Sequence, residues 1–493
     1  MARPPAPAGA TPAPDGTGFC TARDRPFLLA AAILASALGF IDGTVVAIAL
    51  PAMRESLGAG LGAAQWIANA YMLALSALIL AGGALGDRLG TARVFGGGIA
   101  LFVAASLLCG LAASPGVLIA ARALQGVGAA AMVPGSLALI ARAYPEAERG
   151  RAIGIWAAAS AVTTAGGPVL GGAILALGPE AWRAIFLVNL PLGGVALWLL
   201  LAHVARDRAA AAPAAVDWPG AALVTGGLGC IALALTASEH GGAPGPRDLA
   251  LAAAGLGLLG LFLLVERRAP APMLPLDVFA RPGFAAVNAV TLTLYFALST
   301  ILFFLPMTVI SGWGRPPLAA AFVFVPLSAL IGALSPGFGR LAGRWGARRF
   351  IAGGAAVAGL GYLAMAAAAP AQAFWSGMVP AALLMGLGMA LVVAPLSTAV
   401  MASAGAGRAG VASGVNNAVS RTAGLLAVAA MGPVAATAYG AAGGPASFGA
   451  AAAAEAARGH GTAMSAAFST LAAISALLAF ASAALAWTGL RRI

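Results

Sequence analysis

The 493-residue sequence contains no lysine, and Asp, Glu and Arg together make up only 9% of it, against roughly 25% charged residues in soluble domains. A P-loop needs Gly-Lys-Ser/Thr, so the absence of lysine excludes that loop and argues against direct ATP-driven pumping by this chain. Cysteine is also scarce. Cys20, Cys109 and Cys230 are odd in number and scattered, which argues against a disulfide framework or a cysteine zinc site.

Apolar residues, in contrast, make up 61% of the chain. They suffice for about fourteen membrane-spanning helices of ~20 residues each. The net charge of +12 would suggest a nucleic-acid partner in a soluble protein, but basic loops between membrane spans account for it equally well. The composition therefore predicts an all-α polytopic membrane protein with no nucleic-acid partner.

The apolar runs define the layout. Residues 1–26 are rich in Pro, Ala and Gly, which predicts a disordered cytoplasmic tail. The first run is too long for a signal-peptide core, so it is expected to be a permanent span. The fourteen predicted spans are 27–50, 65–86, 94–112, 115–140, 151–176, 184–204, 218–238, 249–265, 284–310, 318–338, 350–369, 375–403, 410–432 and 466–488.

The arginines predict the orientation, because cytoplasmic loops carry the excess of basic residues. With the N-terminus inside, 20 of the 27 arginines fall in inner segments, and Arg122 and Arg421 fall within spans. The five predicted in outer loops are Arg54, Arg183, Arg247, Arg315 and Arg458. A missed span would destroy this asymmetry. The sequence therefore predicts an even number of spans in a plasma (inner) membrane protein, with both termini cytoplasmic.

Two segments repeat each other at an offset of 256 residues, GALGDRLGTAR (83–93) and GRLAGRWGARR (339–349). Each follows the second span of a six-helix set. This spacing predicts two six-helix halves, 27–204 and 284–493, with two extra helices in 205–283. Duplicated halves around a midplane site are a transporter architecture.

Six motifs occur in order along this layout. They are FIDGTVVAIALP (40–51), QWIANAYML (65–73), GALGDRLGTAR (83–93), LIAARALQGVGAA (118–130), GPVLGG (167–172) and WRAIFLVNLPLG (182–193). Together they resemble the fourteen-helix drug:proton antiporters of the major facilitator superfamily, over essentially residues 27–490. The resemblance implies the major-facilitator fold and secondary active efflux of small, often lipophilic compounds against proton entry, by alternating access.

Asp42 is the only acidic residue that the predicted layout places within the membrane. Such a group costs at least ~2.5 kcal/mol there, so it should face a cavity or a partner. Burial favours the protonated carboxyl and a nearby cation favours the carboxylate, which suits Asp42 to load and release a proton. The alternative is a structural acid bonded to a neighbouring helix. The resemblance also places an aspartate at this position and so favours a proton carrier.

Arg122 is the predicted partner of Asp42. A rise of about 1.5 Å per residue puts both side chains roughly 10 to 12 Å from the outer face. Gln125 follows on the same helix face and is a candidate for the substrate cavity. The alternative is an arginine held by backbone carbonyls. In the resembling family, this motif is associated with proton transfer.

Two glycine-containing motifs are expected to act mechanically. A cytoplasmic gating loop that latches the halves is predicted at Gly83, Asp87, Arg88, Gly90 and Arg93, with interfacial anchoring charges as the alternative. The antiporter-type motif comprises Gly167, Pro168, Gly171 and Gly172. It is expected to be either a rocking hinge or tight helix packing, and the resemblance favours efflux over uptake.

Further cavity candidates are Trp156, Asn288, Tyr295, Asn417 and Arg421. The last two follow Ser413 at a spacing of four residues, which forms a polar stripe that must face protein or a cavity. Inter-helix hydrogen bonding is the alternative for this stripe. One membrane acid against two arginines disfavours a dicationic cargo if both arginines line the cavity.

Other classes of protein find little support. His203, His240 and His460 are far apart in the sequence, and no G-x-S-x-G elbow occurs, so the chain is not expected to be an enzyme or to need a cofactor or metal. The remaining alternatives are a proton-independent facilitator, a metabolite exporter on the same fold and a non-transporting membrane sensor. A monomer is compatible with the sequence. The outer segment 433–465 receives no role.

Overall fold

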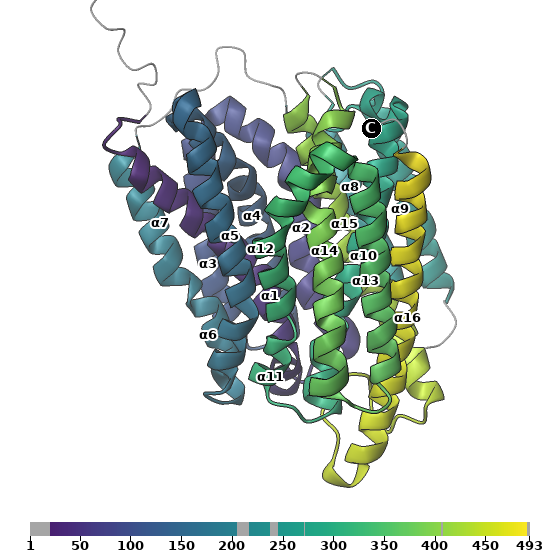
Figure 1. Cartoon of the computed structure of the whole chain (residues 1–493). Coiled ribbons are helices and arrows are strands. Elements are labelled where there is room, and N and C mark those ends of the chain that lie inside the picture. The colour runs from purple at the N-terminus through teal and green to yellow at the C-terminus, as the bar shows by residue number, and fades with distance from the viewer. Residues whose placement is uncertain (1–19, 205–215, 237–244, 271, 406–407, 491–493) are drawn as a thin grey trace, which may run out of the picture.

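The computed structural model describes residues 20–204, 216–236, 245–270, 272–405 and 408–490. In this part of the chain, fourteen helical segments are long and apolar enough to cross a membrane, as the sequence predicts. Most of the predicted tail, residues 1–26, lies outside the described residues. The described chain is built from helices that run nearly side by side (Figure 1).

The first six crossings form the N-terminal half, and a helical hairpin follows them. The half comprises α1 (Arg25–Leu57), α2 (Leu61–Leu89), α3 (Thr91–Gly110), α4 (Pro115–Ala143), α5 (Glu146–Leu175) and a composite crossing of η1 (Pro179–Ala181), α6 (Trp182–Leu187) and α7 (Asn189–His203). The extra hairpin consists of α8 (Trp218–Thr236) and α9 (Pro246–Glu266). It packs against α2 and α15, outside the two halves.

The last six crossings form the C-terminal half. A short helix, η2 (Leu276–Ala280), leads into it. Its elements are α10 (Pro282–Met307) with η3 (Thr308–Gly312), α11 (Pro317–Phe322) with α12 (Val325–Trp345), α13 (Ala347–Ala368), η4 (Phe374–Met378) with α14 (Val379–Ser403), α15 (Ala409–Ala441), and η5 (Ala454–Ala456) with α16 (Ala457–Gly489).

The outer segment is more helical than the predicted spans imply. The spans at 410–432 and 466–488 leave 433–465 outside the membrane helices, whereas α15 continues to Ala441 and α16 begins at Ala457. The α15 extension, 433–441, contains four alanines, the strongest helix former, so it continues the helix where hydropathy alone no longer marks a span.

The internal repeat is visible in the backbone. Gly90 joins α2 to α3 at φ +100° and ψ +127°, and Gly346 joins α12 to α13 at φ +89° and ψ +130°. These two residues are 256 positions apart, the offset found in the sequence. Side chains other than glycine rarely adopt positive φ, so the repeated glycines allow two consecutive helices to be joined by a single residue.

Close approach between helices follows the same plan in both halves. A Cβ on Gly98 of α3 would lie 2.8 Å from the carbonyl oxygen of Gly128 on α4. In the C-terminal half, a Cβ on Gly354 of α13 would lie 2.7 Å from the carbonyl oxygen of Gly388 on α14. Small residues at these points let the backbones touch, which is how membrane helices gain packing energy.

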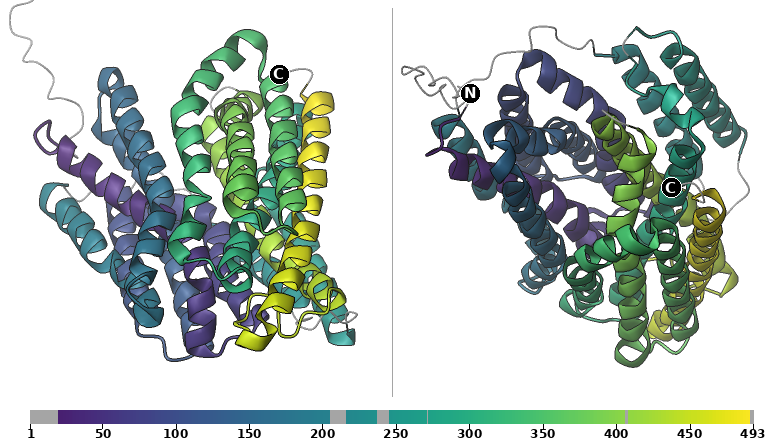
Figure 2. Two further views of the ribbon diagram at one scale, coloured as in Figure 1. Left: turned by 60° about the horizontal axis from the view of Figure 1, so that its bottom comes forward. Right: turned by 45° about the horizontal axis from the view of Figure 1, so that its top comes forward.

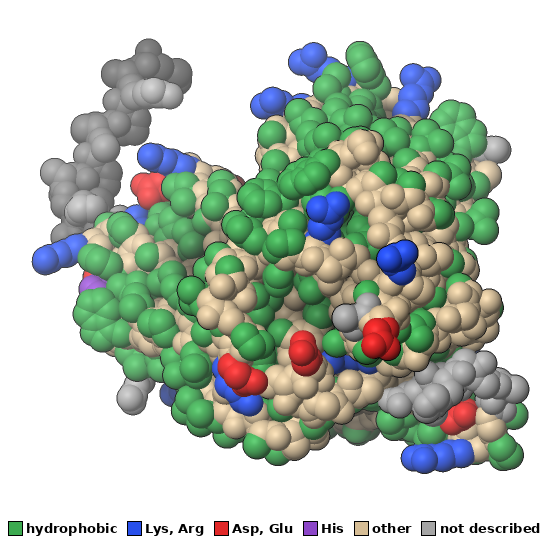
Figure 3. All heavy atoms as spheres, turned by 90° about the horizontal axis from the view of Figure 1, so that it is seen from below, with side chains coloured by type: hydrophobic (Ala, Val, Ile, Leu, Met, Phe, Trp, Pro, Cys, Tyr) green, Lys and Arg blue, Asp and Glu red, His purple; other side chains and the backbone are tan. Residues whose placement is uncertain are grey.

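The two halves meet near one end of the bundle and diverge toward the other (Figure 2). We call the end with the start of α1 and the end of α16 the terminal face, and the other end the opposite face. The helices join across the halves through α2 with α15 and through α5 with α11 and α12. Seen from the opposite face, the surface is mainly apolar and uncharged, with scattered charged side chains (Figure 3).

Arg54 joins the two halves at the opposite face. The sequence places it in an outer loop, but α1 continues past it to Leu57, and its side chain is only 4% exposed. Its Nη1 donates to the carbonyl oxygen of Phe448 at 2.6 Å, and its Nη2 donates to Ser447 Oγ at 3.1 Å. Phe448 and Ser447 belong to the C-terminal half. The buried guanidinium therefore fastens α1 to the segment between α15 and α16.

Replacing Arg54 with alanine is expected to loosen this closure, because it removes the charged hydrogen bonds that join the halves. Spin labels at Leu177→Cys and Ala442→Cys, in a Cys230→Ser background, would report the distance across the opposite face. We expect a longer and broader distance distribution in Arg54→Ala. The matched control is Arg458→Ala, which removes an exposed arginine from the same face. Equal distributions in both variants would show that Arg54 does not hold the halves together.

Candidate functional site

Asp42 on α1 and Arg122 on α4 form a buried ion pair. Arg122 Nη1 lies 2.5 Å from Asp42 Oδ2, and the two residues are 2% and 1% exposed. Arg122 Nε also donates to the carbonyl oxygen of Ile67 on α2, at 3.0 Å. The sequence predicts this pair from helical depth, and the packing of α1, α2 and α4 brings the two side chains together.

Gln125, a predicted cavity residue, lies in this network, and it is not among the lining residues of the two cavities between the halves that are described below. Its Oε1 accepts a hydrogen bond from Arg122 Nη1 at 2.7 Å, and its Nε2 donates to Ser106 Oγ at 2.7 Å and to Asp42 Oδ1 at 3.4 Å. The Gln125 side chain is fully buried. The cost of burying its polar atoms is offset because they have hydrogen-bond partners on α1, α3 and α4.

Sequence reasoning misses two members of the network. Ser106 on α3 accepts a hydrogen bond from Asn189 Nδ2 at 3.3 Å, and both residues are fully buried. Asn189 occurs in WRAIFLVNLPLG, so the motif contained a signal for it. Ser106 has no such signal, because a serine in a membrane helix often bonds only to its own backbone.

Tyr71 on α2 lies between the network and a cavity that is described below. Its ring centroid lies 4.4 Å from Arg122 Cζ, within the range of a cation–π contact. Its backbone approaches α4 at Gly126, where a Cβ would lie 2.5 Å from the Tyr71 carbonyl oxygen. Tyr71 also lines one of the cavities described next. The ion pair is thus one side chain away from that cavity.

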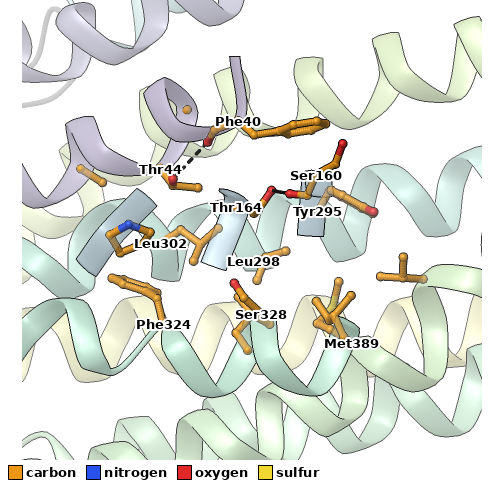
Figure 4. Close-up of a pocket in the computed structure, with 16 residues that line it drawn as sticks. Phe40, Thr44, Ser160, Thr164, Tyr295, Leu298, Leu302, Phe324, Ser328 and Met389 are labelled. Atoms are coloured by element: carbon orange, nitrogen blue, oxygen red, sulfur yellow. Dashed lines mark hydrogen bonds between the residues drawn. The ribbon is translucent and has the colours of Figure 1, made fainter. Parts of the chain in front are cut away.

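A central cavity of about 400 Å³ lies between the halves (Figure 4). Its walls come from α1, α5, α10, α12 and α14, and they are mainly apolar. The polar groups among them are the side chains of Thr44, Ser160, Thr164, Tyr295 and Ser328. Three of these hydroxyls donate to carbonyl oxygens of their own helices, so few donors are free for a ligand. Tyr295, a predicted cavity residue, lies on this wall.

A second cavity, of about 380 Å³, shares Phe40 with the central one and is more polar. We call it the polar cavity. Its lining includes three predicted residues, Trp156, Asn417 and Arg421, and it extends to Gly83 near the terminal face. Arg421 is the charged side chain in its described lining. The polar stripe on α15 therefore faces a cavity rather than lipid.

Asn288, another predicted cavity residue, is not among the lining residues of these two cavities. It lines a separate, lateral cavity of about 350 Å³ between the extra hairpin, α2, α10 and α15. It is 4% exposed, and its Oδ1 accepts a hydrogen bond from Asn416 Nδ2 at 3.2 Å. This hydrogen bond between two asparagines joins α10 to α15 inside the C-terminal half.

The predicted gating loop is a one-residue turn. Asp87 and Arg88 lie in the last turn of α2, Gly90 is the turn, and Arg93 lies in the first turn of α3. All three charged side chains are exposed. The described ion pairs include none of them, in this conformation with the halves apart at the terminal face. Their latching role stays a prediction.

The antiporter-type motif brings α5 close to two other helices. A Cβ on Gly171 would lie 2.4 Å from Val45 Cγ2 on α1, and one on Gly172 would lie 2.7 Å from Leu318 Cα on α11. Gly167 faces α1 in the same way, and Pro168 lines the central cavity. The motif therefore lies where the two halves touch, beside the central cavity.

Comparison with known proteins gives the class of this protein. Residues 32–429 match the Major Facilitator Superfamily, and the chain belongs to this family of membrane transporters, which are not enzymes. It is 34% identical to the multidrug resistance protein Stp of Mycobacterium tuberculosis, over 82% of this chain and 75% of the relative. It is also 32% identical to the tetracenomycin C resistance and export protein of Streptomyces glaucescens (85% and 77%) and 34% identical to the cephamycin export protein CmcT of Amycolatopsis lactamdurans (82% and 83%).

Solved structures share the fold. A bacterial homologue of the human lysosomal transporter Spinster, in an inward-facing and unoccupied conformation, superposes with a TM-score of 0.66 at 18% identity, covering 94% of this chain and 98% of that one. A D-xylose–proton symporter superposes with a TM-score of 0.63 at 14% identity, covering 94% and 97%. The major-facilitator fold expected from the motifs is thus confirmed.

Proposed function

We propose that this chain exports small lipophilic compounds in exchange for protons. The names of its relatives, which include a multidrug resistance protein and two antibiotic export proteins, support export. The observation that carries proton coupling is the buried Asp42–Arg122 pair, one tyrosine away from the polar cavity. The charge of this buried carboxylate is balanced by a single arginine. Protonation of the carboxyl therefore removes the attraction that holds the pair together.

The arginine distribution supports assigning the terminal face to the cytoplasm of a plasma membrane protein. In that orientation, the cavities of this conformation serve the cytoplasmic side, and Arg54 closes the external side. In the proposed cycle this conformation is the one that has released its proton, with Asp42 and Arg122 paired. Cargo enters from inside while the proton site is empty.

The return step follows from the same pair. When the halves close at the cytoplasmic side and open outside, cargo leaves and an external proton reaches Asp42. Protonation removes the charge that holds Arg122 and favours the return to the inward-facing state, where the proton is released. Cargo and proton each shift the equilibrium through different affinities for the two states. The cycle needs protons, a small molecule and the lipid bilayer, and a monomer is compatible with it.

The charge of the cavities supports a cargo class. The described lining of the central cavity is uncharged, and Arg122 is sealed beneath Tyr71. Of the two arginines predicted within the membrane, Arg421 belongs to the described lining of the polar cavity and Arg122 does not. The cavities therefore favour neutral, zwitterionic or anionic compounds. A dicationic compound would meet one positive charge and no negative one within the described lining.

Replacing Arg421 with glutamine is expected to change cargo charge preference. It removes the positive charge of the polar cavity and keeps a hydrogen-bonding side chain. Transport of an anionic dye should fall several-fold, transport of a neutral dye should change little, and a dicationic dye should gain transport. These rates are measured in proteoliposomes. The same relative rates in wild type and Arg421→Gln would show that this arginine does not select cargo.

The proposed function is tested with purified wild-type protein in proteoliposomes that carry a proton gradient. A proton-coupled exporter accumulates a neutral dye against its gradient and loses this accumulation when an ionophore dissipates the proton gradient. A facilitator equilibrates the dye with or without the ionophore. A sensor gives no flux for any dye. Only the first result supports the proposal.

A further inference from the structure

The extra hairpin holds two carboxyl groups that the transport cycle above does not use. Asp217 directly precedes α8, and Glu266 is the last residue of α9, so both lie at the terminal face of the hairpin. The Glu266 side chain is buried, at 3% exposure. A carboxylate in such a place is costly unless its charge is compensated.

One oxygen of each carboxyl group accepts a hydrogen bond from the backbone, and the other oxygen faces the second carboxyl group. Asp217 Oδ1 accepts a hydrogen bond from the amide of Gly220 at 2.8 Å, and Glu266 Oε2 accepts one from the amide of Leu274 at 3.2 Å. The remaining oxygens, Asp217 Oδ2 and Glu266 Oε1, are buried and have no donor among the described residues. A Cβ on Gly220 would lie 2.4 Å and 2.9 Å from these two oxygens, so both point at the same spot.

A proton between the two facing oxygens satisfies both of them. Ionised carboxylates only accept hydrogen bonds, so two of them leave both oxygens unsatisfied and repel each other. A single proton makes one carboxyl group the donor and the other the acceptor, and it removes one of the two buried charges. Pairs of carboxyl groups that share a site retain one proton for this reason.

The charged side chains around the pair do not replace that proton. Arg267 and Arg268 follow Glu266 but are exposed, as are Asp87 and Arg88 at the end of α2, the helix that packs against the hairpin. Asp277 and Arg408 near η2 form an exposed pair with each other, and the Arg408 guanidinium lowers the pKa of Asp277. None of the ion pairs in the described chain includes Asp217 or Glu266. The described residues also contain no group of three or more potential metal ligands.

We propose that Asp217 and Glu266 bind one proton between them, and that this proton fastens the α8–α9 hairpin to the segment leading into α10. The site is separate from Asp42 and does not depend on the proposed export activity.

The site lies next to α2, the helix that ends in the predicted gating loop. Val216, beside Asp217, packs against Ala81 and Ala221, and Met273, beside Leu274, packs at the edge of the same cluster. Ala81 belongs to α2. As the pH on this side rises and the shared proton leaves, two buried carboxylates repel each other and the contact weakens.

Infrared difference spectroscopy on the purified full-length protein tests the site. All samples carry Asp42→Asn, which removes the signal of the coupling carboxyl. A pH jump upward should remove the C=O band of one protonated carboxylic acid per chain. Glu266→Gln and Asp217→Asn should each abolish this band, because an amide then donates the hydrogen bond without a titrating proton. Glu146→Gln, an exposed acid at the same face, is the matched control and should keep the band.

A thermal unfolding series gives a second readout in the same samples. A proton bound more tightly by the folded chain stabilises it at low pH, so the Tm of the parent should fall as the pH rises through the titration of the pair. This fall should disappear in Glu266→Gln and in Asp217→Asn. Gly220→Ala, which places a methyl group between the oxygens, should lower the Tm most at low pH.

Two outcomes would overturn the proposal. One is a band and a Tm profile in the two amide variants that match Glu146→Gln. The other is a parent protein whose Tm rises on addition of sodium or calcium while its pH dependence vanishes, since the oxygens would then hold a cation. Neither outcome bears on Asp42, so the failure of this site is distinguishable from the failure of the export mechanism.

Discussion

Replacing Asp42 with asparagine is expected to abolish proton-driven transport and to leave cargo binding in place. Asparagine keeps the size of the side chain and a hydrogen-bond acceptor for Arg122, but it takes up no proton. One pH unit is worth ~1.4 kcal/mol per proton, so an exchange of one proton for a neutral compound sustains about tenfold accumulation per pH unit. In Asp42→Asn this accumulation should fall to none. It is measured as the dye ratio across proteoliposomes at a fixed pH gradient.

Cargo affinity separates a coupling defect from a folding defect. Asp42 lies outside the described walls of both cavities between the halves, so dye binding to purified Asp42→Asn should stay close to that of wild type. Glu55→Gln, an exposed acid on the same helix, is the control and should accumulate dye normally. If Asp42→Asn accumulates dye as well as Glu55→Gln does, the coupling proton binds elsewhere.

Replacing Arg122 with leucine is expected to destabilise the fold more than any other single change considered in the site. It leaves the Asp42 carboxylate buried without its cation, and breaking a buried ion pair from one side costs about 3 to 5 kcal/mol. Gln125 Oε1 loses its hydrogen bond from Arg122 at the same time and keeps the one from Cys109 Sγ. The expected result is a large fall in the midpoint of thermal unfolding in detergent at neutral pH.

The double variant Asp42→Asn with Arg122→Leu tests the cause of that loss. It removes both charges, so most of the stability lost in Arg122→Leu should return, although coupling stays absent. Protonation of Asp42 also neutralises the unpaired charge, so Arg122→Leu alone should become relatively more stable as the pH falls. Equal instability of the single and double variants at every pH would show that packing of the arginine stem, not charge, dominates at this position.

The sequence predicts the fold well because the signals are long and repeated. Fourteen apolar runs, an even span count and the glycine turn repeated at Gly90 and Gly346 all point to two six-helix halves with an extra pair. The pairing of Asp42 with Arg122 is also predictable, since helical rise gives their depth and an unpaired membrane charge is costly. Helix boundaries are less predictable where alanine continues a helix beyond its apolar core, as in α15.

The cavity could be predicted only in part. Tyr295, Asn417, Trp156 and Arg421 lie on cavity walls, but Gln125 belongs to the ion-pair network and lies outside them. Spacing along one helix says which residues share a face, and it does not say which neighbouring helix covers that face. The contacts of Arg54 could not be predicted either, because its partners are about 390 residues away in sequence.

Vesicles loaded with a neutral cargo test the central claim most directly. They carry the purified protein and a luminal pH indicator, start with no pH gradient and are clamped at zero voltage. As cargo leaves down its own gradient, proton exchange predicts that the lumen becomes more acidic, and Asp42→Asn should abolish the pH change. A lumen that becomes more alkaline would show co-transport, and a constant pH during cargo exit would show transport without protons. Either result would contradict the account.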